Sequence, residues 1–132
     1  MKQLAYLFAV IVAFASSACS SNRSFVPIYD TCFDVTDCEP ASSACGFMSF
    51  QFGTLIFENA ICTVQCVDDF DCPPSFNGEP GGCYPEAFAD GFPGCVERCF
   101  NDGDCPSGFT CSGAGELGFL VPGDSICVPG PS

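Results

Sequence analysis

The cysteines are the residues whose number and spacing give this chain its most distinctive chemistry. The sequence has 13 of them in 132 residues and contains no histidine. Cysteines of an exported chain form disulfides, whereas zinc needs free thiolates, usually in CxxC pairs or beside histidines. The closest cysteines here have the wider spacing CxxxC, in CTVQC and CVERC. We therefore expect disulfides, with no bound metal and no other cofactor.

Twelve of the cysteines fall into three tandem groups of four. Each group begins with a CxxxxxC segment, and the groups start at Cys32, Cys66 and Cys99, a period of 34 and then 33 residues. A fixed period of this length indicates one small module in three copies. The predicted disulfide cysteines are Cys32, Cys38, Cys45, Cys62, Cys66, Cys72, Cys83, Cys95, Cys99, Cys105, Cys111 and Cys127.

Four cysteines allow three pairings within a module. We favour links from first to third and from second to fourth, because these crossed links would tie the opening segment to both strands of a hairpin. Links across the CxxxC spacers would leave Cys32 and Cys127 without partners at opposite ends of the array. A disulfide that closes a loop of about 15 residues contributes about 3 kcal/mol, and so small a module buries little apolar surface. We expect disulfides, rather than a core, to dominate stability.

Short hairpins and long loops are predicted to hold the cysteines in place. The strongest strand pattern is GFMSFQFGTLIFENAIC in the first module, with Gly53 at the hairpin turn. The longer intervals of the other two modules are rich in Gly and Pro, which predicts turns and loops. No window has the apolar spacing of a helix. The predicted fold class is small and disulfide-rich: a linear array of three tandem four-cysteine modules, each with a short β-hairpin and long loops, and little helix outside the signal peptide.

The first residues resemble a bacterial lipoprotein signal. Lys2 precedes an apolar run that is too short to span a bilayer, and small residues lead to Cys19. The resemblance implies cleavage before Cys19, lipid on this cysteine, membrane attachment through the lipid and an even set of remaining cysteines. The sequence SSA before Cys19 is also a site for an ordinary signal peptidase, so free secretion stays open, and either route leads out of the cytoplasm. The predicted segments are a signal peptide (1–18), a tether (19–29) and modules at 30–63, 64–96 and 97–132.

The charge balance narrows the class of partner. Arg23 and Arg98 are the basic residues beyond Lys2, against 16 Asp and Glu residues. Nucleic acid and anionic lipid head groups both require lysine and arginine, so neither is expected to bind directly. An acidic surface suits a cationic partner or divalent ions, or simply gives solubility.

Asp and Asn residues recur at two positions of the CxxxxxC segments. We predict that these side chains accept hydrogen bonds from backbone N–H groups and so close and cap a turn in each module. The alternative is that they are oxygen ligands of Ca²⁺. The positions hold Asp34, Asp68 and Asn101 near the first cysteine, and Asp37, Asp71 and Asp104 before the second.

The phenylalanines supply most of the large apolar surface. Alternation along the predicted hairpin places Phe50 and Phe52 on the same face, beside Met48. This face would either pack between adjacent modules or form an exposed contact site. The residues directly after the first cysteines are expected to pack on the disulfides of their own module. They are Phe33, Val67 and Phe100.

The opening segments CFNDGDCPSGFTC and CVDDFDCPP resemble small extracellular disulfide modules. They look like the start of the Dickkopf amino-terminal cysteine-rich domain and of EGF-like and EB-type modules, and the Dickkopf resemblance implies protein binding. They are also similar to whey acidic protein domains, which implies protease inhibition, although the adjacent cysteines of those domains are absent here. Together with its signal, the chain looks most like a bacterial cysteine-rich repeat lipoprotein.

Catalysis has little support, because without histidine a serine or cysteine nucleophile lacks its usual base. No catalytic residues are predicted. We expect a non-enzymatic, extracytoplasmic disulfide-rich protein, a monomeric surface lipoprotein with a binding or structural role and an unknown protein partner. The alternatives are a secreted protease inhibitor that offers the loop 73–82 or 112–126 to an active site, and a calcium-dependent adhesion module.

Overall fold

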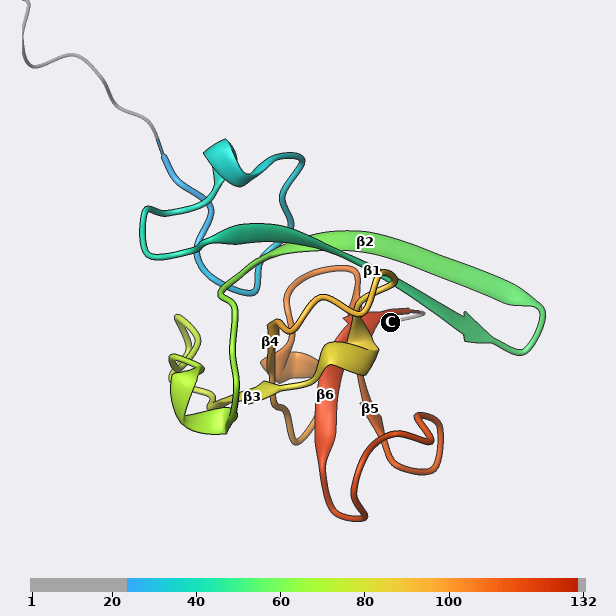
Figure 1. The fold of residues 1–132 in the computed structure, drawn as a ribbon. Helices are drawn as coiled ribbons and strands as arrows, with labels where there is room; N and C mark the ends of the chain where they lie inside the picture. Colours follow the sequence, from blue (N-terminus) through green and yellow to red (C-terminus); the bar gives the residue numbers. More distant parts are fainter. Residues whose placement is uncertain (1–23, 131–132) are drawn as a thin grey trace, which may run out of the picture.

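A computed structural model of the chain describes residues 24–130, which form three two-stranded antiparallel hairpins joined by turns and loops (Figure 1). None of the helices in this part of the chain is long and apolar enough to cross a membrane. The predicted fold class, small and disulfide-rich with a hairpin in each module, is confirmed. The hairpins pair β1 (Ala44–Phe52) with β2 (Leu55–Thr63), β3 (Gly81–Cys83) with β4 (Cys95–Glu97), and β5 (Phe109–Gly113) with β6 (Ser125–Pro129). The helical elements are single 3₁₀ turns: η1 (Val35–Asp37), η2 (Asp69–Asp71), η3 (Pro85–Ala87) and η4 (Asp102–Asp104).

The hairpin of the first module has the turn that the sequence predicts. Phe52 pairs with Leu55, which leaves Gly53 and Thr54 as a two-residue loop. Gly53 has a φ of 62°, a left-handed conformation that glycine adopts without steric penalty. Figure 1 shows that the long strands β1 and β2 carry this turn well beyond the rest of the molecule.

Each module has two disulfides with the crossed pairing that was expected. The third and fourth cysteines face each other across the hairpin, as Cys45 and Cys62 do in β1 and β2. The two earlier cysteines of the module each bond to one of them, so the opening segment is attached to both strands. Three sulfur atoms from the two disulfides lie within 4.8 Å of one another in every module. The bonds are Cys32–Cys45, Cys38–Cys62, Cys66–Cys83, Cys72–Cys95, Cys99–Cys111 and Cys105–Cys127.

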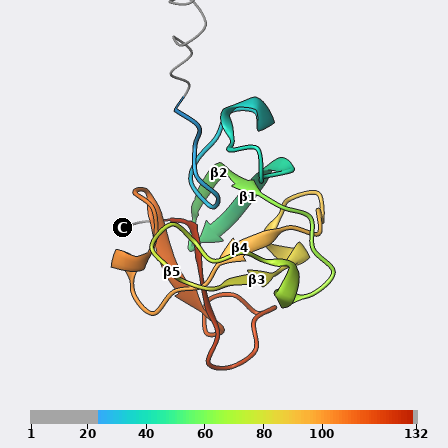
Figure 2. The same cartoon turned by 90° about the vertical axis from the view of Figure 1, so that its left-hand side faces the viewer.

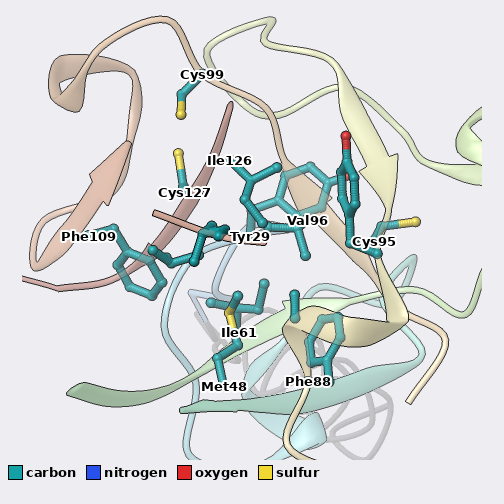
Figure 3. Close-up of a cluster of buried hydrophobic side chains, with 14 of the residues drawn as sticks. Tyr29, Met48, Ile61, Phe88, Cys95, Val96, Cys99, Phe109, Ile126 and Cys127 are labelled. Carbon is teal, nitrogen blue, oxygen red and sulfur yellow. The ribbon is translucent and has the colours of Figure 1, made fainter. Parts of the chain in front are cut away.

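One hydrophobic core joins the three modules (Figure 3). The expectation of a linear array, in which disulfides take the place of a core, is wrong in this respect: a single module buries too little apolar surface, and the three modules pool theirs. Ile126 in β6 and Val96 in β4 are completely buried, and β6 contacts β1, β2 and β4. Met48 and Phe50 also lie in this core, so the hairpin face predicted from alternation packs between modules. The largest fully buried side chains include Tyr29, Met48, Ile61, Val96, Ile126 and Val128.

The end of the predicted tether belongs to the folded unit. Tyr29 is 2% exposed, and its hydroxyl donates a hydrogen bond of 2.6 Å to the carbonyl of Pro73 in the second module. Residues 24–29 therefore connect the first module to the second rather than serve only as a spacer. The rest of the predicted tether, with Cys19, and the predicted signal peptide lie outside the described residues.

Candidate binding surface

Three equivalent turns follow the first cysteines of the modules, and each is built by the same hydrogen bonds. In the first module, the Asp34 side chain accepts a hydrogen bond of 3.0 Å from the backbone N–H of Thr36. The Asp37 side chain accepts two bonds of 3.0 Å, from the N–H groups of Phe33 and Asp34. This reciprocal arrangement is a capping box, which satisfies donors that a short helical turn leaves free. The same boxes are formed by Asp68 with Asp71 and by Asn101 with Asp104.

The capping role predicted for these acidic side chains is therefore confirmed. The N–H groups of Val67 and Asp68 hold the pKa of Asp71 below its ordinary value, so this carboxylate stays charged. Among residues 24–130, the groups of three or more ligand atoms that lie close enough for one metal ion consist of cysteine sulfurs, and every such sulfur is in a disulfide. The aspartates of the three capping boxes thus close turns, and no three carboxylates among the described residues have oxygens close enough to form a preassembled calcium site.

The residue after each first cysteine points into solvent. Phe33 is 103% exposed, Val67 is 92% exposed and Phe100 is 87% exposed. The prediction that they pack on the disulfides of their own module is wrong. The backbone enters each turn in an extended conformation, where successive side chains point in opposite directions. Because Cys32 and Cys66 are buried, the side chain that follows each of them faces outward.

The second turn carries one more exposed ring. Phe70 in η2 is 99% exposed, so this turn presents both Val67 and Phe70 among the carboxylates of its own segment. In Figure 2 the coiled turns η1 (cyan), η2 (light green) and η4 (orange) lie at three different corners of the molecule. The apolar side chains are therefore displayed at separate places rather than as one patch.

A charged network fixes the second turn against the third module. The Arg98 guanidinium forms an ion pair of 2.6 Å with Asp69 in η2, and its Nε donates a hydrogen bond of 3.1 Å to the Tyr84 hydroxyl. The Tyr84 hydroxyl in turn donates a hydrogen bond of 3.1 Å to the Asp124 carboxylate. Arg98 is the one lysine or arginine among residues 24–130, so the described residues hold no further basic side chain for other carboxylates.

The two loops predicted to enter a protease have different structures. In the loop 73–82, the Ser75 N–H donates to the Glu79 carbonyl at 2.7 Å, and the Glu79 N–H donates to the Ser75 hydroxyl at 3.1 Å. Phe76 lies within this closed loop and is 88% exposed. The loop 112–126 instead buries two leucines in the core and is held against it.

A buried carboxylate lies between the modules. Glu97, the last residue of β4, is 3% exposed, and its Oε1 has no hydrogen-bond partner among the described residues. Burial raises the pKa of Glu97 to about 7, although the Ser75 hydroxyl opposes this rise. The only signal in the sequence is its place in the spacer CVERC, between two cysteines that face the interior. The neighbouring carboxylates that raise its pKa further are those of Glu79, Asp104 and Asp30.

The twelve predicted disulfide cysteines are all bonded, whereas Cys19, the predicted lipidation site, lies outside the described residues. The described residues contain two separate features of functional interest. One is the set of three apolar turns, and the other is the buried carboxylate of Glu97. Comparisons of the chain with family models, curated proteins and solved structures found no match.

Proposed function

We propose that this chain is a non-enzymatic, extracytoplasmic binding protein that contacts a protein partner through the apolar side chains of its three turns. The observation that carries the proposal is the exposure of Phe33, Val67 and Phe100 at the same position of every module. The fold does not require apolar side chains there, because none of the three belongs to the core. Exposed apolar groups that the fold does not need are typical of contact sites, and aromatic rings contribute strongly once a partner desolvates them.

The rigidity of the turns supports binding. A capping box closes each turn, and disulfides fix the cysteines on either side of it. A partner that docks on such a turn therefore loses little binding energy to ordering it. Because the turns lie at separate corners (Figure 2), a partner that contacts more than one of them has to be a macromolecule. The net charge of −13 favours a partner with a basic surface, through faster and more selective association.

The proposed location is the outer side of a membrane. Six disulfides are consistent with an oxidising location outside the cytosol. A lipid on Cys19 would attach the modules to that surface, and the small residues before Cys19 support this part of the proposal. The intact mass of the mature protein tests it. We expect a chain that begins at Cys19 and carries acyl groups, and a mature chain without added acyl mass would contradict the anchor.

A comparison of variants tests the binding surface. The oxidised protein is immobilised and exposed to the extracellular proteins of its source, beside a variant that carries Phe33→Ser, Val67→Ser and Phe100→Ser. We expect at least one protein to be retained by the unmodified chain and lost by the variant. If every retained protein binds both chains equally, the three turns are not the contact site.

The matched control changes three exposed apolar residues outside the turns. Serine at these positions removes a similar kind of surface, so a loss of binding that is specific to the turns will leave the control unaffected. The same gain in intact mass on reduction in every chain shows that all chains hold the same number of disulfides. The control residues are Leu55, Ile56 and Val121.

Protease inhibition is the second candidate, and the exposed Phe76 favours it. This ring stands in a loop bounded by the disulfide cysteines Cys72 and Cys83 and closed by hydrogen bonds, which is a preorganised way to offer one apolar side chain to an active site. Proteases that cleave after aromatic residues are the relevant panel. Inhibition at micromolar concentration that Phe76→Ser abolishes would support this candidate, and no inhibition at that concentration would end it.

A further inference from the structure

A small pocket lies where residues of all three modules meet, and Glu97 forms part of its wall. The pocket has a volume of about 110 Å³. Pro27 and Pro106 give it apolar walls, and Asp30, Ser75 and Phe76 also line it. The Glu97 carboxylate in this wall is 3% exposed. The Ser75 hydroxyl is hydrogen-bonded to it, but its Oε1 accepts no hydrogen bond from the described residues.

The charges around this carboxylate are all of one sign. Burial and then the carboxylates of Glu79, Asp104 and Asp30 act to raise its pKa, and Glu97 in turn helps burial to raise the pKa of Tyr29, whose phenol lies nearby. Arg98, the one basic side chain among residues 24–130, is paired with Asp69 and Tyr84 instead. While it is ionised, a buried acid with an unsatisfied oxygen and no counter-ion destabilises a protein, and an outside group that supplies charge and hydrogen bonds removes this penalty.

We propose that this pocket binds a primary alkylammonium group, of the kind that ends a lysine side chain. An ammonium offers three N–H donors and one positive charge, which match the free oxygen of Glu97 and the hydroxyl of Ser75. A water molecule occupies about 30 Å³ in the liquid, so a pocket of about 110 Å³ accommodates an ammonium with the last methylenes of its chain. Pro27 and Pro106 suit those methylenes.

Other cations fit less well. A divalent ion needs several oxygen ligands around one point, and within residues 24–130 no three carboxylate groups have oxygens close enough for one ion. A guanidinium is planar and takes paired acceptors, whereas only one oxygen of Glu97 is free. The pocket is separate from the three apolar turns, so it goes beyond the binding surface proposed above. The test of the pocket does not depend on the result for the turns.

Amide chemical shifts of the oxidised protein, titrated with Nα-acetyl-lysine amide, test the proposal. We expect saturable shifts confined to the residues around Glu97, with a dissociation constant near 1 mM or below. Nα-acetyl-norleucine amide has the same four-carbon side chain without the ammonium, and it should produce no such shifts. Equal shifts from the charged and the neutral ligand, or none from the charged ligand, would overturn the proposal without any mutation.

Two glutamate-to-glutamine changes provide the matched pair. Glu97→Gln should weaken binding at least tenfold, while Glu58→Gln, on the exposed side of β2, should change it less than twofold. Because an ammonium prefers ionised Glu97, binding should also weaken at least tenfold from about pH 8 to about pH 5.5. If Glu97→Gln binds as well as the unmodified chain, or if only Ca²⁺ produces saturable shifts at these residues, the pocket is not an ammonium site.

Discussion

Replacing Glu97 by Gln should make the folded protein more stable, by an amount that grows above pH 4.5 and is complete above about pH 7. The carboxylate is 3% exposed, one of its oxygens accepts no hydrogen bond, and its neighbours are acidic. Glutamine has nearly the same shape and carries no charge. The substitution therefore removes a buried charge while it keeps the packing between β4 and the core.

The magnitude follows from the pKa. Burial raises the pKa of Glu97 from 4.5 to about 7 in the folded chain, and at 1.36 kcal/mol per pKa unit this rise corresponds to about 3 kcal/mol. Below 4.5 the group is neutral in both states and carries no penalty. Between 4.5 and about 7 the folded state holds more protons than the unfolded state, so stability falls as pH rises. Above that window the full penalty is present.

Urea unfolding with intact disulfides measures this difference. The chain has no tryptophan but three tyrosines, two of which lie in the fold, so tyrosine fluorescence reports on unfolding. At about pH 8 we expect Glu97→Gln to raise the free energy of unfolding by about 1 to 3 kcal/mol, because the buried amide offsets part of the gain. At about pH 4 the two chains should agree within about 1 kcal/mol. Glu58→Gln is the exposed control.

A variant that is no more stable than the unmodified chain at about pH 8 would contradict a buried charge at Glu97, and so would a stability difference that does not change with pH. Using the difference between two chains removes the effects of the other carboxylates, which are common to both. Asp71, for example, has a lowered pKa and contributes a pH dependence of the opposite sign.

Four further changes test the remaining parts of the structure. Replacing both Cys38 and Cys62 by serine opens a 24-residue link and should lower the free energy of unfolding by about 3 kcal/mol; a loss below about 1 kcal/mol would show that the link contributes little. Met48→Ala should cost about 2 to 5 kcal/mol in the same urea assay, and a much smaller loss would argue against a shared core. Gly53→Ala should cost about 1 kcal/mol in urea, because alanine disfavours a left-handed conformation, and a neutral effect would contradict the turn. Phe33→Ser should change stability by less than about 0.5 kcal/mol, since a ring in solvent contributes nothing to packing, and a larger loss would place that ring in contact with the fold.

Local rules predicted the parts of this fold that depend on neighbouring residues. The cysteine period gave the number of modules, and compactness within a module favoured the crossed links, such as Cys38–Cys62. Asp34 and Asp37 cap their turn because a short polar side chain near free N–H groups has few better partners. Gly53 marks its turn because few other residues accept that backbone conformation.

The packing between modules could not be predicted from local sequence rules. Whether Met48 is buried depends on how the three hairpins meet, and no spacing in the sequence encodes that arrangement. Phe33 was nevertheless within reach of a simple rule, since the residue that follows an inward-facing cysteine in an extended segment points outward. The burial of Glu97 is contrary to the usual preference of acidic side chains for solvent. Its residue type therefore predicted an exposed side chain.

Hydroxyl-radical footprinting of the oxidised protein, read by mass spectrometry, compares phenylalanines that the structure places outside and inside. Phe33 and Phe100 are exposed, whereas Phe88 and Phe109 are 3% and 2% exposed in the shared core. Since all four are the same residue type, differences in oxidation report solvent access. We expect strong oxidation of the first pair and almost none of the second. Comparable oxidation of all four rings would contradict both the shared core and the outward turns on which the proposed binding surface depends.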